Sequence, residues 1–372
     1  MKKVVTSLLA VLIVTMVTLF TLEGIYSLVR DDELHTSVTF QAINLGKRAL
    51  GYEKELVGAY EPMFSDASDL GDLVPKIHEA GIGIGNAPFP EAKSEAAAVN
   101  IVVDGCPTLK PNLNKTAFYL RTNAFNPLDP PSIFHDQGQV FEPELAEFFE
   151  RYGGRRVSMT TNADGERTTL PRVESERKVL IAGDSVAFGA LIDDSETLAS
   201  QLQARGRSRQ YVNLGVAGSD AEEVICRLQK ATEARYDGQI DELIYVYCEN
   251  DLKYKRPYGK PEDAIAWIRD FAQRQGIEKV TIVFSPYVYL AAPEVTRFRG
   301  YDGGTYPHRV EGRQALKAEV EKAGFNWIDV GEIARQAIEE SRSQFGFFPL
   351  YTDHNHLSPE GTRRLADRLA AL

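Results

Sequence analysis

Cysteine is scarce in this chain of 372 residues, which contains only Cys106, Cys226 and Cys248. An odd number of cysteines excludes a fully paired disulfide scaffold. If the protein is exported, one disulfide and one remaining thiol are possible. The pair we favour is Cys226–Cys248, because both residues lie in the regular second half of the chain. Three buried free thiols are at least as good an interpretation.

Blocks of basic residues are also missing. The chain has 42 Lys and Arg against 53 Asp and Glu, a formal net charge of −11. Without a basic stripe, nucleic-acid binding is not expected, and the acidic balance mainly indicates solubility. No His/Cys cluster has the spacing of a metal site. Glycines at 81, 83 and 85 neither follow a strand nor open a helix, so no dinucleotide cofactor is expected either.

One long hydrophobic run is present, at residues 4–22, directly after Lys2 and Lys3. A run of this length can cross a bilayer. The positive charges before it predict a cytoplasmic N-terminus, with residues 1–29 as a single-pass membrane anchor and the body in the periplasm or exterior. A cleaved signal peptide is the alternative, but its apolar core would normally be shorter and end at an Ala-x-Ala-like site, which is absent here.

Residues 30–172, which we call the accessory region, lack a regular alternation of strands and helices. Two stretches, 66–81 and 142–153, are amphipathic, and two more, 100–105 and 116–122, could be strands. Proline-rich segments interrupt the rest. The pattern fits either a small α+β domain or a shell around the second half of the chain.

The second half of the chain, residues 173–372, is regular and predicts a separate domain. Apolar strands are expected at 179–183, 211–216, 242–248, 279–287 and 326–331. Helices are expected at 194–205, 219–234, 261–275, 310–323 and 358–371. This alternation predicts a five-stranded parallel sheet covered by helices on both faces, and right-handed crossovers make it a flavodoxin-like three-layer α/β/α sandwich. The long connection at 289–309 has the length of a functional lid.

Two distant pieces of this domain carry residues suited to nucleophilic catalysis. A Gly-Asp-Ser motif follows the first strand, so Ser185 falls where a helix begins, at the carboxyl end of a parallel sheet. Near the C-terminus, Asp353 and His356 have a spacing that lets His356 act as the base and Asp353 orient it. Each residue has an ordinary alternative: Ser185 as a helix N-cap, and His356 as a surface histidine, like the nearby His354.

These motifs resemble the four blocks of the SGNH (GDSL-type) hydrolase superfamily, over roughly residues 173–372, which we therefore call the catalytic domain. In chain order the blocks correspond to Ser185, Gly215, Asn250 and the pair Asp353 and His356. The resemblance implies an oxyanion hole made of the backbone N–H groups of Ser185 and Gly215 and the side-chain amide of Asn250. The third block departs from the usual Gly-x-Asn-Asp, because this chain has Cys248-Glu249-Asn250-Asp251.

The apolar N-terminal run and the family resemblance together predict a membrane-anchored, extracytoplasmic serine esterase, and the resemblance implies that it forms an acyl-enzyme on Ser185 and passes the acyl group to water. The expected substrate is an O-acyl ester, foremost an O-acetyl ester, on a carbohydrate or envelope polymer. Two alternatives remain open. One is an O-acyltransferase that uses the same triad to modify an exported polysaccharide, and the other is a catalytically silent, flavodoxin-like binding module. Nothing in the sequence indicates the oligomeric state.

Overall fold

The computed structural model describes residues 99–119, 132–136, 155–252, 256–287, 307–342, 348–352 and 355–372, together with Thr18 and Ala291. Apart from Thr18, the expected anchor at 1–29 lies outside the described residues, as do the amphipathic stretches 66–81 and 142–153. The same holds for most of the expected lid at 289–309. Within the described ranges, no helix is both long and apolar enough to span a membrane.

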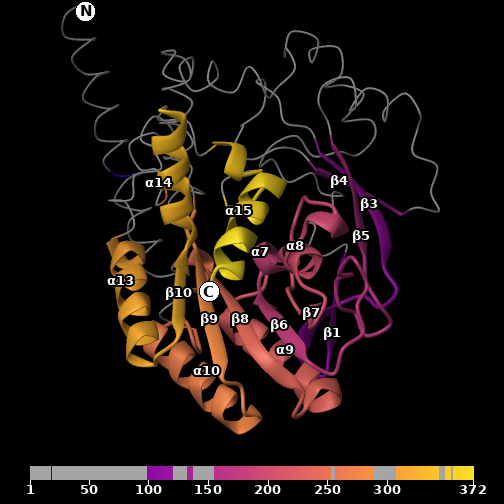
Figure 1. Cartoon of the computed structure of the whole chain (residues 1–372), viewed down its shortest axis with the longest axis horizontal. Helices are drawn as coiled ribbons and strands as arrows, with labels where there is room; N and C mark the ends of the chain where they lie inside the picture. Colours follow the sequence, from indigo (N-terminus) through magenta and orange to yellow (C-terminus); the bar gives the residue numbers. More distant parts are fainter. Residues whose placement is uncertain are drawn as a thin grey trace, which may run out of the picture.

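A five-stranded parallel sheet lies at the centre of the protein (Figure 1). Its strands are β6 (Lys178–Gly183), β7 (Gln210–Asn213), β8 (Ile240–Cys248), β9 (Lys279–Ser285) and β10 (Asn326–Asp329). They are arranged in the order β10-β9-β8-β6-β7, and every neighbouring pair is parallel. This is the flavodoxin-like order, which puts the switch point of the sheet beside β6. The predicted parallel sheet is therefore confirmed.

Helices cover both faces of the sheet, which explains why its strands are apolar along their whole length. In β8, every residue except Asp241 is buried. One face packs against α8 (Leu198–Arg205), α14 (Val330–Ser341) and α15 (Pro359–Ala370). The other face packs against α9 (Ala221–Ala231), α10 (Pro261–Gln275) and α13 (Pro307–Lys322). The result is the three-layer sandwich that the sequence predicts.

The boundaries of some elements differ from the prediction. Strand β7 ends at Asn213 rather than at residue 216, and residues 194–196 form a 3₁₀ turn before α8 instead of its first turn. Helix α14 is missing from the prediction. It follows β10 without a loop, and Asp329 caps it by accepting a hydrogen bond from the Gly331 N–H at 2.7 Å. The apolar run therefore continues across the junction and resembles a longer strand.

The described part of the accessory region is built from antiparallel strands. A hairpin joins β1 (Asn100–Val103) to β2 (Cys106–Leu109), and a three-stranded sheet has the order β4-β3-β5. The strands of this sheet are β3 (Asn114–Tyr119), β4 (Ser132–Asp136) and β5 (Arg155–Thr160). The two possible strands of the sequence analysis thus correspond to β1 and β3. The accessory sheet lies beside the β7 edge of the parallel sheet (Figure 1).

A disulfide joins the accessory region to the catalytic domain. It links Cys106 of β2 to Cys226 of α9, with the two Cα atoms 5.6 Å apart, and Cys248 is a buried free thiol. The predicted Cys226–Cys248 pair is therefore wrong. Cys248 ends β8 in the middle of the sheet, whereas Cys226 lies on the helix that packs against the β2 strand.

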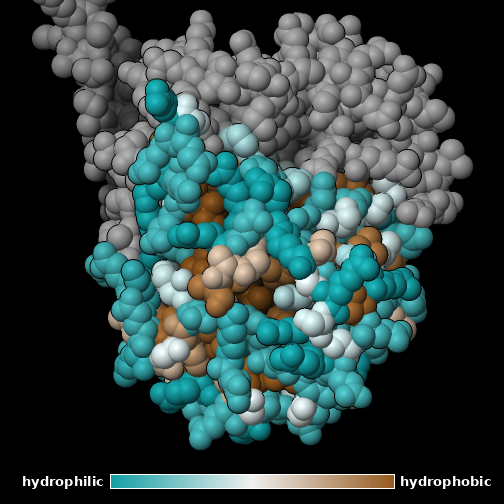
Figure 2. Space-filling model, in the orientation of Figure 1, coloured by the Kyte–Doolittle hydropathy of each residue, from teal (hydrophilic) through white to brown (hydrophobic). Residues whose placement is uncertain are grey.

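Hydrophilic residues cover most of the described surface on the face drawn in Figure 2, and hydrophobic residues show mainly between the helices. Among the described residues, the exposed large hydrophobic side chains are those of Val102, Val103 and Leu372. The distribution fits the acidic composition, because the apolar side chains are used inside the sandwich and the charged ones outside it.

Candidate active site

Ser185 and His356 meet at the carboxyl end of the parallel sheet. Ser185 is the first residue of α7 (Ser185–Phe188), a four-residue helix that follows β6. Its Oγ lies 2.8 Å from Nε2 of His356, although 171 positions separate the two residues in the sequence. Ser185 is 7% exposed, so its hydroxyl lies at the edge of the interior. The distance suits transfer of a proton from the serine to the histidine.

The preceding residue, Asp184, caps helix α7. Its Oδ1 accepts a hydrogen bond from the Val186 N–H at 2.9 Å. The C=O group of Ser185 accepts hydrogen bonds from the N–H groups of Gly189 and Ala190, both at 3.0 Å. Because Asp184 is the N-cap, the Ser185 hydroxyl is not needed for capping and faces His356 instead. This geometry disfavours the N-cap alternative for Ser185.

Backbone contacts on either side of His356 hold it in place. Tyr351 and Leu357 form an antiparallel bridge, and the Thr352 N–H donates to the carbonyl of His356 at 2.8 Å. Ser358 then caps α15, because its Oγ accepts a hydrogen bond from the Gly361 N–H at 3.1 Å. With its backbone held in this way, the imidazole of His356 lies against the first residue of α7.

The two other histidine-loop candidates lie outside the described residues. Asp353 is the predicted orienting carboxylate, and His354 is the competitor for the role of the base. The orienting role of Asp353 therefore stays a prediction. The choice of His356 over His354 is supported by the 2.8 Å contact of His356 with Ser185.

Asn250 lies in a 3₁₀ turn at the end of β8, Glu249–Asp251, and reaches the same corner of the sheet. Its Nδ2 donates a hydrogen bond to Oδ2 of Asp184 at 3.1 Å. A side-chain amide has two N–H donors, so the second remains for another acceptor. The Oδ1 of Asn250 is buried and has no hydrogen-bond partner in the described parts of the chain. The structure thus places the Asn250 amide next to the residue that precedes Ser185.

Asp184 is fully buried, and this burial raises the pKa of its carboxyl above the usual value. The Val186 N–H, the charge of His356 and the Asn250 amide act in the opposite direction and favour the carboxylate. Asp184 therefore contacts or influences most of the residues that the sequence assigns to the site, although the sequence analysis gives it no role of its own. Its position inside the Gly-Asp-Ser motif is the signal that could have identified it.

The unusual third block, residues 248–251, fixes the end of β8 next to the site. Glu249 is fully buried and accepts a hydrogen bond from the Tyr287 N–H at 2.9 Å, which ties the end of β8 to the chain after β9. The Cys248 N–H donates to Oδ2 of Asp251 at 2.9 Å. Burial also raises the pKa of the Cys248 thiol well above its usual value. The thiol is thus held neutral, and its chemistry is that of a core residue.

Gly215 lies in the loop that follows β7. Its N–H donates to Oδ1 of Asn213 at 2.9 Å. A Cβ atom at Gly215 would lie 2.1 Å from the backbone nitrogen of Phe188, so Gly215 packs directly against α7. The oxyanion role that the family resemblance gives to the Gly215 N–H stays a prediction.

No group of three His, Cys, Asp or Glu side chains among the described residues is arranged to hold a metal ion. At this corner of the sheet the described side chains supply a hydroxyl from Ser185, an imidazole from His356, a carboxyl from Asp184 and an amide from Asn250. Such a set can deliver a nucleophile, accept and return a proton, and bind a developing oxyanion.

No family model matches the chain, and no curated protein sequence matches it. Solved structures that resemble it include a lipolytic G-D-S-L family member from Veillonella parvula, with 14% identity, 53% of this chain and 97% of that chain covered, and a TM-score of 0.41. A carbohydrate acetylesterase family member from Sinorhizobium meliloti has 16% identity, coverage of 52% and 96%, and a TM-score of 0.37. An acetyl xylan esterase has 15% identity, coverage of 52% and 98%, and a TM-score of 0.39.

One of these structures is named for the lipolytic G-D-S-L family, and the other two are named as acetylesterases. The reaction proposed below is inferred from the Ser185–His356 contact and not from these similarities.

Proposed function

We propose that the protein is a serine ester hydrolase in which Ser185 is the nucleophile and His356 the general base. The observation that carries this proposal is the 2.8 Å contact between Ser185 Oγ and His356 Nε2 at the carboxyl edge of the sheet. His356 takes the hydroxyl proton as Ser185 attacks the ester carbonyl, and it returns the proton to the leaving alcohol. Water, activated by the same imidazole, then cleaves the acyl-enzyme.

The tetrahedral intermediate needs donors for its oxyanion. The second N–H of the Asn250 amide and the backbone N–H of Ser185 are the donors that we assign. The third donor that the family resemblance implies is the backbone N–H of Gly215, which also donates to Oδ1 of Asn213. Asp353 is assigned to orient the imidazole of His356 through Nδ1.

The substrate that we propose is a small O-acyl ester, foremost O-acetyl, on a carbohydrate or envelope polymer. This choice rests on the family resemblance of the sequence and on the expected export of the domain. We further propose that residues 1–29 anchor the protein with its N-terminus in the cytoplasm, as the lysines before the apolar run indicate. Deleting residues 1–29 should then yield soluble, active enzyme, because no proposed catalytic residue lies there.

An O-acyltransferase would use the same residues and differ only in the acceptor. Measuring acyl release in parallel with acyl transfer to sugar hydroxyls separates the two reactions. If the donor ester is consumed and its acyl group is recovered on the sugar in equal amount, the function is acyl transfer and not hydrolysis. A wild-type protein that neither reacts with an organophosphonate nor turns over any acyl ester would instead favour the silent binding module.

The first prediction tests the nucleophile and the base. Ser185→Ala should abolish both ester turnover and labelling by an organophosphonate. His356→Ala should lower kcat by roughly 10⁴-fold or more, because the serine loses its base. His354→Ala is the matched control and should have little effect. Reversed effects of the two histidine variants would refute the assignment of His356.

A further inference from the structure

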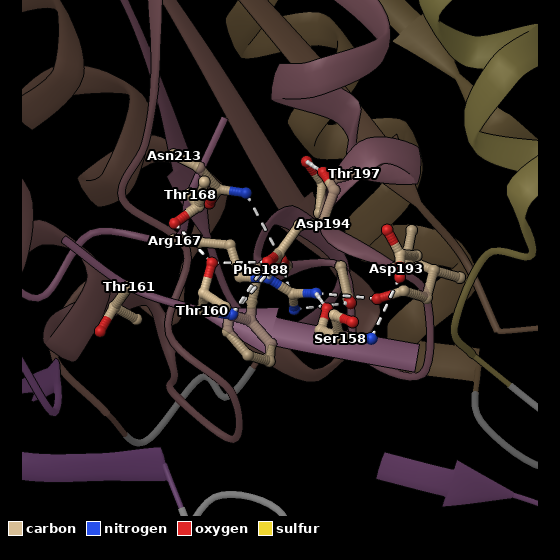
Figure 3. Close-up of polar contacts among 12 residues, drawn as sticks. Ser158, Thr160, Thr161, Arg167, Thr168, Phe188, Asp193, Asp194, Thr197 and Asn213 are labelled. Carbon is tan, nitrogen blue, oxygen red and sulfur yellow. Dashed lines mark hydrogen bonds and ion pairs between the residues drawn. The ribbon is translucent and has the colours of Figure 1, made fainter. Parts of the chain in front are cut away.

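The guanidinium of Arg167, from the accessory region, is buried against the end of the helix that begins with Ser185. Its side chain is fully buried and contacts both the carboxylate of Asp194 and the ring of Phe188 (Figure 3). Arg167 Nε lies 2.7 Å from Asp194 Oδ1, and its Cζ lies 4.5 Å from the centre of the Phe188 ring. A buried arginine needs a partner for its charge and acceptors for its donors.

Each of the five N–H groups of Arg167 has an acceptor. One serves Asp194, and the four on the Nη atoms match four backbone carbonyls. Nη1 donates to Phe188 at 3.4 Å and Gly189 at 3.1 Å, and Nη2 donates to Ser158 at 3.2 Å and Ile192 at 2.8 Å. Three of these four carbonyls belong to the chain that leaves α7. Only the planar fork of arginine presents five donors in this arrangement.

Helix α7 depends on such contacts because it is very short. A helix of four residues forms one turn, which is unstable without tertiary support. The segment that follows has left-handed φ angles at Gly189 (81°) and at Leu191 (62°), a conformation that leucine rarely adopts. Arg167 binds the carbonyls on either side of Leu191 and thereby holds this segment in place.

A second contact fastens the same end of α7 to the parallel sheet. Asn213, the last residue of β7, donates from Nδ2 to the Phe188 carbonyl at 3.4 Å, and the backbones of Asn213 and Arg167 form an isolated bridge. Asp194 is in turn bound to β5, since it accepts hydrogen bonds from the Thr160 N–H at 3.0 Å and the Thr160 hydroxyl at 2.6 Å. Arg167 therefore sits where α7, β7 and the accessory sheet meet.

We propose that Arg167, supported by Asp194, is a positioning residue for catalysis: it fixes α7 so that Ser185 Oγ stays within reach of His356 Nε2. The proposal rests on the proposed function of Ser185. In this proposal a residue of the accessory region, Arg167, supports the activity of Ser185, which belongs to the catalytic domain. A displacement of a reacting group by about 1 Å can lower a rate about 100-fold, so a small movement of α7 suffices.

The test separates positioning from a general loss of stability. Arg167→Met and Arg167→Lys are compared with Arg227→Met, which removes another buried arginine at the same interface. Arg227 Nη2 donates to the Gly165 carbonyl at 2.8 Å, so its hydrogen bond goes to the accessory region and not to the chain around α7. Purified full-length variants are assayed for thermal unfolding, for the rate of organophosphonate labelling of Ser185, and for kcat and KM on a small acetyl ester, all per folded enzyme.

For the folded Arg167 variants we expect kcat and the labelling rate to fall about 10- to 100-fold, with KM changed less than threefold. Arg167→Lys should not restore the rate, because an ammonium group cannot reach the same carbonyls. Arg227→Met should keep kcat within threefold of wild type, even if its unfolding temperature falls as much as that of the Arg167 variants. If Arg167→Met does not fold, Asp194→Asn takes its place, since it keeps the shape of the side chain while it removes the charge and turns one of the two acceptor oxygens into an NH₂ group.

Folded Arg167 variants, or the Asp194→Asn substitute, with wild-type kcat and labelling rate would overturn the proposal and leave Arg167 a purely structural residue. An equal fall of kcat in Arg227→Met would overturn it as well, because the effect would not be specific to the contact with α7. A wild-type protein without any labelling or turnover would refute the proposed function itself, and the positioning role with it. The wild-type measurement thus distinguishes the two failures.

Discussion

At the scale of single residues, Asp184 connects more of the site than either Ser185 or Asn250 does. One of its carboxylate oxygens caps α7, and the other receives the Asn250 amide at 3.1 Å. Burial raises the pKa of Asp184. Both of its oxygens nevertheless accept a hydrogen bond, and a carboxylate is the form in which both oxygens are acceptors only. Asp184 therefore orients the amide that we assign to the oxyanion.

Replacing Asp184 by asparagine tests this role. In Asp184→Asn, one carboxylate oxygen becomes an NH₂ group, which cannot accept a hydrogen bond from Nδ2 of Asn250. The Asn250 amide should then rotate and offer its oxygen to the new donor. We expect kcat to fall by about 10- to 100-fold, somewhat less than after removal of an oxyanion donor.

Steady-state kinetics of Asp184→Asn and of Asn250→Ala, alone and combined, measure the coupling between the two positions. Effects smaller than additive in the double variant would show that they act through one amide. Fully additive effects would contradict the orienting role of Asp184. Asn250→Ala alone should cost about 3 kcal/mol of transition-state stabilisation.

At the scale of elements, α7 is held between the 214–220 loop and Arg167. The loop approaches so closely that only a residue without a side chain fits at Gly215, where a Cβ would meet the backbone of Phe188 and Ala187 at 2.1 and 2.6 Å. The block-two glycine is thus explained by packing against the nucleophile helix. Its N–H stabilises the loop by donating a hydrogen bond to Oδ1 of Asn213.

The Gly215→Ala variant should therefore shift α7 and destabilise the domain. Overpacking of this kind costs about 1–3 kcal/mol, and each kcal/mol lowers Tm by roughly 2–4 °C in a domain of this size. Activity should fall with it, because Ser185 moves with α7. Gly206→Ala is a suitable control, since Gly206 has an extended backbone and a Cβ there would have no neighbour within 4 Å. An unchanged Tm and kcat in Gly215→Ala would contradict this packing role.

The elements also show how far the sequence could predict this fold. Buried strands such as β8 are predictable because covering helices make them apolar throughout, and the strand–helix alternation then dictates the parallel sheet. The end of β7 and the start of α14 could not be predicted, because hydrophobic periodicity does not change there. Both boundaries depend on single contacts instead. Gly215 packs against α7, and Asp329 accepts a hydrogen bond from the Gly331 N–H.

In the same way, the pair Ser185 and His356 could be predicted from motif spacing and family resemblance, whereas Arg167 could not. Arg167 lies in an irregular stretch of the accessory region, and nothing near it in the sequence indicates burial. Only the folded chain shows that its guanidinium reaches the carbonyls after α7.

At the scale of the whole molecule, the described accessory region and the catalytic domain share a hydrophobic core. Val157 and Met159 of β5 pack in one cluster with Phe188 and Leu191, which follow Ser185 in the chain. Buried polar contacts add to it: Glu166 accepts hydrogen bonds from the Tyr236 hydroxyl at 2.5 Å and from Arg235 at 2.9 Å. The described accessory strands therefore resemble a supporting layer of the catalytic domain more than a separate unit.

The disulfide closes this interface and yields the last prediction, a count of thiols. Cys106 and Cys226 are 120 residues apart, and a cross-link over a loop of that length stabilises the fold by about 4–5 kcal/mol in the chain-entropy description. Native protein should expose no reactive thiol, because Cys248 is buried and its pKa is raised. Denatured, unreduced protein should show one thiol, and reduced protein three.

The cysteine variants extend the count to function. The double variant Cys106→Ala and Cys226→Ala should unfold at a lower temperature than wild type, and so should the reduced wild-type protein, while reduction of the double variant should change nothing further. Because the bond fastens β2 to α9 and not to α7, folded double variant should keep most of its kcat. Three thiols in the unreduced, denatured protein would contradict the bond. A loss of kcat as large as that of the Arg167 variants would show that α9, too, helps to position Ser185.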